Sequence, residues 1–97
     1  MKERDIEAYF VKRVKEAGGE QRKFVSPGHK DVADRIVGFP VARVSLVELK
    51  APGKKPRAGQ LREALKWLEI GVKTYFLDSK EEVDSFIWLM TEADKRK

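Results

Sequence analysis

Apolar residues recur along the first part of the chain at a helical spacing. Ile6, Phe10 and Val14 stand four residues apart, which predicts a helix over residues 3–17. The Gly18-Gly19 pair that follows is a typical helix stop. The chain therefore begins with an amphipathic helix that has one face to bury.

Three segments after this helix are predicted as strands, over residues 22–26, 34–38 and 41–50. Pro27-Gly28 separates the first two, and a tight connection around Phe39-Pro40 joins the second to the third. In the third segment both alternating faces carry apolar residues, which is typical of a central strand covered on each side.

The remaining half predicts two helices separated by a strand over residues 72–77. A helix over residues 58–70 is expected to turn four apolar residues inward: Leu61, Ala64, Leu65 and Leu68. Ser79 and Glu82 have the spacing of a capping box, which predicts the start of the last helix. Its buried face is expected to carry Val83, Phe86, Ile87 and Met90. The order is α-β-β-β-α-β-α in a single domain over residues 1–97.

Glu48 and Lys50 stand in an unexpected place, at the end of the most apolar strand. Because side chains alternate along a strand, both share a face with Val44 and Leu46, which is expected to be interior. A buried carboxylate is costly unless it is paired or bound to a metal ion. Two interpretations remain open for this strand alone: a structural ion pair near solvent, or a functional site.

Asp34 favours the functional interpretation. If the hairpin turns about residue 41, Asp34 lies directly opposite Glu48, with Cβ atoms about 4.5–5.5 Å apart. Two carboxylates held so close stay ionised only with a cation between them, and Mg²⁺ suits such oxygen ligands. With Lys50 on the same face, this pattern predicts metal-assisted phosphodiester hydrolysis. A register slip of one residue would move Asp34 to the opposite face.

Glu7 is the candidate for a further acidic group at this site, because it lies at the border of the first helix's apolar stripe. Glu3 lies within that stripe but at the fraying end of the helix. The alternative for Glu7 is a solvated position where it pairs with a basic neighbour: Arg4, Lys12 or Arg13.

Composition narrows the classes of protein. Hydrophobic residues make up 41% of the chain, which is typical of a globular domain, and 21 Lys and Arg against 16 Asp and Glu give +5. The absence of cysteine excludes a disulfide framework, a zinc finger and a thiol nucleophile. A charged N-terminus and the lack of a run of about 20 apolar residues predict a cytoplasmic protein without membrane contact.

Several cations lie close to the predicted site in sequence, and we expect them to contact DNA phosphates without reading base sequence. They are His29, Lys30, Arg35, Lys54, Lys55 and Arg57. The alternative for each is ordinary solvation of a surface loop. His29 is not expected to ligate a metal, because the chain has no second histidine.

The motifs D-R-I-V at 34–37 and V-E-L-K-A-P-G at 47–53, with Gln60 after them, resemble the VRR-NUC (virus-type replication-repair nuclease) family. This family belongs to the PD-(D/E)XK nuclease superfamily, and the resemblance covers about residues 3–86. It is closest to the compact viral and bacterial branch. Ala33 stands where the family usually has proline, which should affect backbone rigidity slightly and chemistry not at all.

The resemblance implies a compact α/β fold, a restriction-endonuclease-like αβββαβα core with a mixed central sheet flanked by helices. It implies that Asp34, Glu48 and the Leu49 carbonyl bind Mg²⁺, for which Mn²⁺ substitutes. It also implies a catalytic Lys50, a first-helix acid at Glu7, and Gln60 in support of the site. No organic cofactor is implied.

Stand-alone members of the family are similar to Holliday-junction resolvases that act as homodimers, whereas a related domain in the Fanconi-anaemia-associated nuclease acts on flap-like repair intermediates. The resemblance therefore implies a homodimeric, metal-dependent DNA endonuclease for branched DNA. Trp67, Trp88 and Phe39 are candidates for the dimer interface and equally for the core.

Two other classes of function stay open. A basic α-β-β-β-α module is also similar to double-stranded-RNA-binding domains, so a non-catalytic binder of double-stranded nucleic acid is the main alternative. That alternative leaves Asp34, Glu48 and Lys50 unexplained. The second of these classes is an inactive structural relative of the nucleases.

Overall fold

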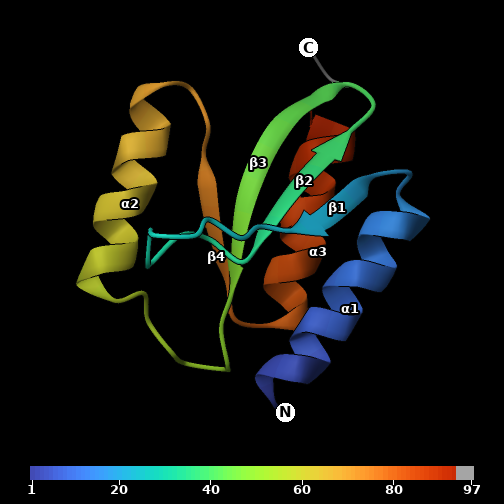
Figure 1. Cartoon of the computed structure of the whole chain (residues 1–97). Coiled ribbons are helices and arrows are strands. Elements are labelled where there is room, and N and C mark those ends of the chain that lie inside the picture. The colour runs from blue at the N-terminus through green and yellow to red at the C-terminus, as the bar shows by residue number, and fades with distance from the viewer. Residues whose placement is uncertain (94–97) are drawn as a thin grey trace.

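The computed structural model describes residues 1–93 and confirms the predicted order of elements (Figure 1). A short π-helical turn, η1, extends the last helix. The elements are α1 (Glu3–Glu16), β1 (Glu20–Lys23), β2 (Arg35–Phe39), β3 (Ala42–Leu49), α2 (Ala58–Glu69), β4 (Thr74–Leu77), α3 (Lys80–Trp88) and η1 (Leu89–Ala93).

The four strands form one mixed sheet in the order β1-β2-β3-β4. The first three strands are antiparallel, and β4 pairs parallel to β3. A parallel pair requires a crossover, which α2 supplies. Figure 1 shows α2 beside β4 on one side of the sheet, with α1 and α3 on the other. The sheet therefore has two faces of different character.

The apolar core lies between the sheet and the α1–α3 pair. Val47 and Leu49 of β3 face Phe10 of α1 and Phe86 of α3, and all four side chains are buried. The predicted inward residues Val83, Phe86 and Ile87 are buried in α3, and Met90 is buried in η1. This face of the sheet supplies most of the apolar burial that stabilises the fold.

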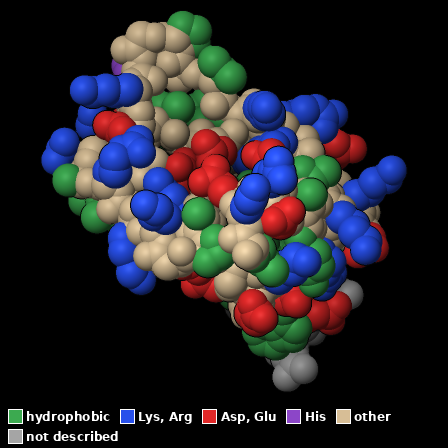
Figure 2. Space-filling model, turned by 90° about the horizontal axis from the view of Figure 1, so that it is seen from below, with side chains coloured by type: hydrophobic (Ala, Val, Ile, Leu, Met, Phe, Trp, Pro, Cys, Tyr) green, Lys and Arg blue, Asp and Glu red, His purple; other side chains and the backbone are tan. Residues whose placement is uncertain are grey.

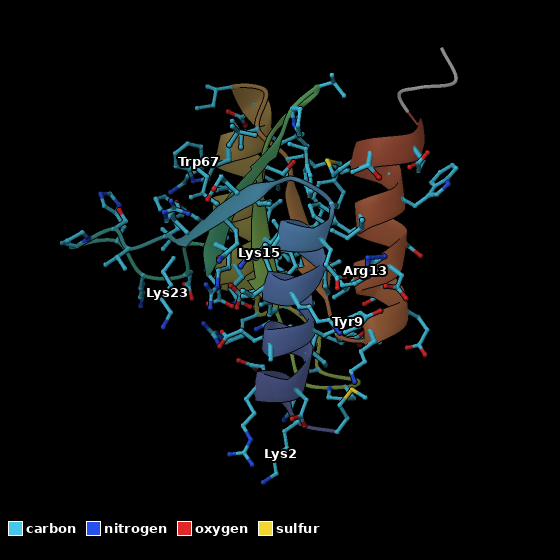
Figure 3. The ribbon with its side chains drawn as sticks, turned by 90° about the vertical axis from the view of Figure 1, so that its right-hand side faces the viewer. Lys2, Tyr9, Arg13, Lys15, Lys23 and Trp67 are labelled. Atoms are coloured by element: carbon cyan, nitrogen blue, oxygen red, sulfur yellow. The ribbon has the colours of Figure 1, made fainter. Side chains whose placement is uncertain are left out.

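Polar contacts also join α1 to α3. Asp84 accepts a hydrogen bond from the Tyr9 hydroxyl at 2.6 Å and from Arg13 Nε at 3.2 Å. Figure 3 shows Tyr9 and Arg13 on the side of α1 that faces α3. The hydrogen bond to Asp84 is the main cause that raises the pKa of Tyr9. These contacts hold α1 and α3 together outside the apolar core.

The prediction that the three leucines of α2 point inward is wrong. Leu61, Leu65 and Leu68 are 47%, 59% and 53% exposed. The inward face carries Gln60, which is buried, together with Ala64 and Trp67, which line a cavity above the sheet. A shift of one residue turns a helix by about 100°. The buried carboxylate beneath α2 needs a hydrogen-bond donor, and Gln60 can face it only in this rotation.

The aromatic residues left open by the sequence separate into different environments. Phe39 is buried in the core. Trp67 is half-buried and packs edge-on against Phe24 at 5.9 Å between ring centroids. Trp88 lies on the exposed side of α3. Phe39 is therefore a core residue and cannot serve as an interface residue.

Several element boundaries differ from the predicted ones, most clearly at β1. β1 begins at Glu20, two residues earlier than expected, because residues 20–23 pair in register with 38–35 of β2. At α3, Ser79 is the N-cap, as predicted, and accepts the Glu82 N–H at 3.0 Å. Glu82, however, accepts the N–H of Asp78 at 2.8 Å, one residue before the cap. The cap is thus only half of a reciprocal box.

The part of the chain that the structure describes has no helix with the length and apolar content needed to cross a membrane.

Candidate active site

The register of β2 and β3 matches the predicted hairpin. Arg35 pairs with Val47 and Ile36 with Leu46, so Asp34, which precedes β2, comes opposite Glu48. A register irregularity between residues 37 and 39 lies toward the turn and leaves this end undisturbed. Asp34 Oδ2 accepts the backbone N–H of Leu49 at 3.1 Å, which ties its carboxylate to β3.

Glu48 is the most constrained group of the site, with only 6% of its surface exposed. Its Oε2 accepts Gln60 Nε2 at 2.7 Å and lies 3.4 Å from Lys50 Nζ. Burial raises the pKa of Glu48, and the charge of Asp34 raises it further, although Lys50 and Gln60 act in the opposite direction. Burial and the neighbouring carboxylate of Asp34 together therefore outweigh the stabilisation of the Glu48 carboxylate by Lys50 and Gln60.

Lys50 lies on the same face as Glu48, as alternation predicts, and is also buried. Its backbone N–H donates to Leu77 O at 2.9 Å, which fixes the end of β3 against β4. The Glu48–Lys50 contact shows that the ion pair proposed for the strand end is present. The Glu48–Lys50 ion pair is compatible with both interpretations of the strand end, a structural pair and a functional site, and does not decide between them.

Gln60 connects the site to the start of α2. Its Oε1 accepts the backbone N–H of Arg57, the N-cap residue, at 3.0 Å, while its Nε2 donates to Glu48. One buried amide therefore both closes the first turn of the helix and orients the carboxylate. Gln60 is buried beside Glu48 and is not an exposed helix residue, and its support of catalysis stays a prediction.

Glu7 is in a different place from the other predicted acids. It contacts Arg35 across the sheet's other face, with Oε2 3.2 Å from Arg35 Nη2. Within residues 1–93 no three acidic, histidine or cysteine side chains lie close enough together to hold a metal ion. The catalytic role of Glu7 stays a prediction. The remaining candidates for metal ligands are Asp34, Glu48 and the backbone.

Arg35 is 7% exposed, and its Nη1 donates to Gln21 Oε1 at 2.7 Å. With Nη2 paired to Glu7, both terminal nitrogens are engaged within the protein. This burial argues against the predicted phosphate contact and indicates a structural role. Alternation along β2 signals it, because Arg35 shares a face with Val37 and Phe39, both in the core.

The remaining predicted cations lie on the surface, in the loop before β2 and in the segment between β3 and α2, and His29 lines a pocket with Trp67 and Ile70. His29, Lys30, Lys54, Lys55 and Arg57 are all exposed. Figure 2 looks onto the molecule from below the view of Figure 1 and shows acidic side chains gathered near the middle, with lysine and arginine around them. The surface thus combines a central acidic spot with a basic surround.

Asp31 was not predicted at the site, although it interrupts the basic run around it. Its Oδ1 accepts Arg57 Nη2 at 3.1 Å, and its backbone has a left-handed φ of 68°. The carboxyl group lies so close to Gly59 that a methyl group there would overlap it. A larger residue at position 59 would have to displace the Asp31 carboxylate, so this close approach joins the loop before Asp34 to the start of α2.

The donor set fits a hard divalent cation. Asp34 and Glu48 offer carboxylate oxygens from adjacent strands, and Mg²⁺ is typically bound through one or two carboxylates plus water. Burial, and after it the charge of Asp34, raise the pKa of Glu48, and a bound cation would act against both effects. The Leu49 carbonyl as a further ligand stays a prediction.

Comparison with known proteins identifies the family. A solved structure described as "VRR_NUC domain" superposes with a TM-score of 0.80 at 29% identity, covering 88% of this chain and 92% of that one. "Putative nuclease p44" of Acyrthosiphon pisum secondary endosymbiont phage 1 is 42% identical over 81 residues, which are 84% of this chain and 87% of that protein. The chain belongs to the VRR-NUC family of nucleases. No family model matches the sequence. The predicted VRR-NUC fold class is confirmed.

Replacement of Glu48 by Gln should change the pH dependence of stability in this VRR-NUC domain. The pKa of Glu48 is raised in the folded state above its ordinary 4.5, so the folded protein binds this proton more tightly than the unfolded chain. Wild type should therefore lose stability relative to Glu48→Gln as pH rises from about 4 toward neutrality. Urea unfolding at a series of pH values measures this difference.

Glu69→Gln, at the exposed end of α2, is the matched control and should follow wild type at every pH. A difference between wild type and Glu48→Gln that stays constant, or grows in the opposite direction, would contradict the raised pKa.

Replacement of Arg35 by Met should affect stability and leave DNA contact unchanged. It removes the donors to Gln21 and Glu7, which should lower the free energy of unfolding by about 1–3 kcal/mol. Lys55→Met, on the exposed loop, should cost less than about 0.5 kcal/mol. Denaturant unfolding and DNA titration of both variants test the assignment, which fails if Arg35→Met stays stable yet loses DNA affinity.

Proposed function

We propose that this protein is a Mg²⁺-dependent, structure-specific DNA endonuclease that cleaves four-way junctions as a homodimer. One observation carries the proposal: the β2–β3 register sets Asp34 opposite Glu48, with Lys50 buried on the same face. The VRR-NUC fold and the relative described as a nuclease support phosphodiester hydrolysis in general.

Asp34 and Glu48 are the groups that would hold the metal. When bound, the metal supplies positive charge at the scissile phosphate and lowers the pKa of a coordinated water. Lys50 adds a fixed ammonium group, which stabilises negative charge that develops on the phosphate oxygens. Gln60 keeps the Glu48 carboxylate in one orientation, because its own position is fixed by the Arg57 N–H.

The basic surround provides the DNA contacts. His29 and Lys30 lie in the loop before Asp34, and Lys54, Lys55 and Arg57 lie between β3 and α2. Contacts of this kind fix the position of a duplex without reading its sequence. They also make affinity fall steeply with salt, because each neutralised phosphate releases counterions.

The exposed leucines of α2 support a homodimer. Leu61, Leu65 and Leu68 have the i, i+4, i+7 spacing of one helix stripe, and each is about half exposed. A contiguous apolar stripe on a soluble domain typically marks a protein interface. A second copy packed on this stripe gives a two-fold dimer with two active sites, which matches a two-fold symmetric junction.

The non-catalytic binder is the rival function, and the buried site counts against it. A pure binder gains nothing from placing Glu48 in a position that raises the pKa of its carboxyl group. Acidic side chains facing a phosphate would also lower its affinity for nucleic acid. The cluster of Glu48, Lys50 and Gln60 is explained by hydrolysis and not by binding.

A labelled four-way junction, incubated with and without Mg²⁺ or Mn²⁺, tests the activity directly. Lys50→Ala should lower the cleavage rate by about 100-fold or more, because it removes a fixed charge used in the transition state. Its DNA affinity should stay within about tenfold of wild type. Lys55→Ala, the matched control, should lose affinity and keep its maximal rate.

Two outcomes would remove the proposal. Metal-independent behaviour of the wild type, with no nicking of any branched DNA and unaltered binding by Glu48→Ala, would identify a binder. A large loss of binding in Lys50→Ala would show that Lys50 contacts the ground-state DNA and not the reacting phosphate.

Leu65→Glu should convert the dimer into a monomer that still folds, because Leu65 is exposed within one chain. Sedimentation velocity at a series of concentrations measures the assembly, and melting temperature reports the fold. Val25→Glu, on the equally exposed loop between β1 and β2, is the control and should stay dimeric. A wild type that is monomeric at every concentration, or a dimeric Leu65→Glu, excludes this interface.

A further inference from the structure

A small, largely closed cavity of about 10 Å³ lies under α2, next to the candidate site. Glu48 and Gln60 line it on one side, and Leu46, Thr74 and Phe76 of the sheet line it on another. Asp31 and Ala33 of the loop before β2 also line it, whereas Asp34 and Lys50 do not. A water molecule needs about 10–15 Å³ of such space.

Two polar atoms beside this cavity lack hydrogen-bond partners within residues 1–93. They are Glu48 Oε1 and Thr74 Oγ1, both fully buried. The parallel register pairs Leu46 with Thr74 and Glu48 with Phe76, which puts Glu48 and Thr74 on the same face of adjacent strands. An unpartnered buried polar atom costs about 1–3 kcal/mol, so a pair of them at one cavity needs an explanation.

We infer that this cavity binds one structural water, which accepts a hydrogen bond from the Thr74 hydroxyl and donates one to Glu48 Oε1. Such a water satisfies both buried atoms at once, and buried waters typically make two to four hydrogen bonds. The Gln60 amide, which also lines the cavity, offers a further N–H.

The water makes Thr74 a positioning residue for Glu48. Gln60 and Lys50 hold Glu48 Oε2, and the Thr74-bound water holds Oε1. The carboxylate is then fixed at both oxygens and cannot rotate away from Asp34. This consequence rests on the proposed function, in which Glu48 binds the metal, whereas the water site itself does not.

The test compares Thr74→Val, which removes the hydroxyl at similar volume, with Thr74→Ser, which keeps it. High-resolution crystal structures of the metal-free proteins should show the water in wild type and Thr74→Ser and not in Thr74→Val. Mn²⁺ titration followed by electron paramagnetic resonance should show affinity about tenfold weaker for Thr74→Val and near wild type for Thr74→Ser.

Thr91→Val is the matched control, because it removes a hydroxyl that bonds the Ile87 carbonyl at 2.7 Å, away from the site. It should leave Mn²⁺ affinity unchanged. Melting temperatures of all three variants separate a local effect from a loss of folding, and the wild-type structure decides the water site even if Thr74→Val is unstable.

A wild-type structure without a water between these two atoms would overturn the inference. Unchanged Mn²⁺ affinity in Thr74→Val would overturn the positioning role of Thr74. A wild type that neither binds Mn²⁺ nor cleaves DNA would instead remove the proposed function, and the crystal structure would still decide the water.

Discussion

The burial of one carboxylate, Glu48, determines how half of this molecule is arranged. An ionised group taken out of water must find donors, and here they come from Lys50 on the same strand and Gln60 on α2. Because Gln60 has to point at the sheet, α2 is rotated so that its leucines point outward. The exposed apolar stripe, which is the proposed surface for a second copy, is thus linked to the position of one acid.

The two faces of the sheet divide stability from chemistry. On the α1–α3 side, Phe10, Val47 and Phe86 belong to a continuous apolar core that does not involve the site. On the α2 side, polar groups, a small cavity and a glycine held against Asp31 replace tight apolar packing. Side chains alternate along β3, so successive residues point to opposite faces of the sheet. One strand can therefore contribute to the core and to the site. Changes in the site can therefore be made without removing the core.

The sequence was sufficient for the order of elements and for the Asp34–Glu48 register, because a short hairpin and strict alternation leave few choices. It was insufficient for α2, since helical spacing shows which residues share a face but not whether the chain itself covers that face. Arg35 was assigned by its charge, although its position on the strand signals burial. Asp31 and Thr74 come to the site only through tertiary packing, and no local pattern marks them.

Lys50 and Gln60 do not offset the effects that raise the pKa of Glu48, and a bound cation would act in the same direction as these two residues. The pKa of Glu48 is raised although both Lys50 and Gln60 lower it, so burial and the charge of Asp34 are the larger effects. If Lys50 fully offset the effects of burial and of the Asp34 charge on Glu48, there would be no electrostatic reason for a metal to bind. Because Lys50 and Gln60 offset only part of the cost of burying Glu48, the protein can fold without metal. A cation that binds the folded state would then stabilise it further. The charge that strains the strand end is thus the same charge that would recruit the ion.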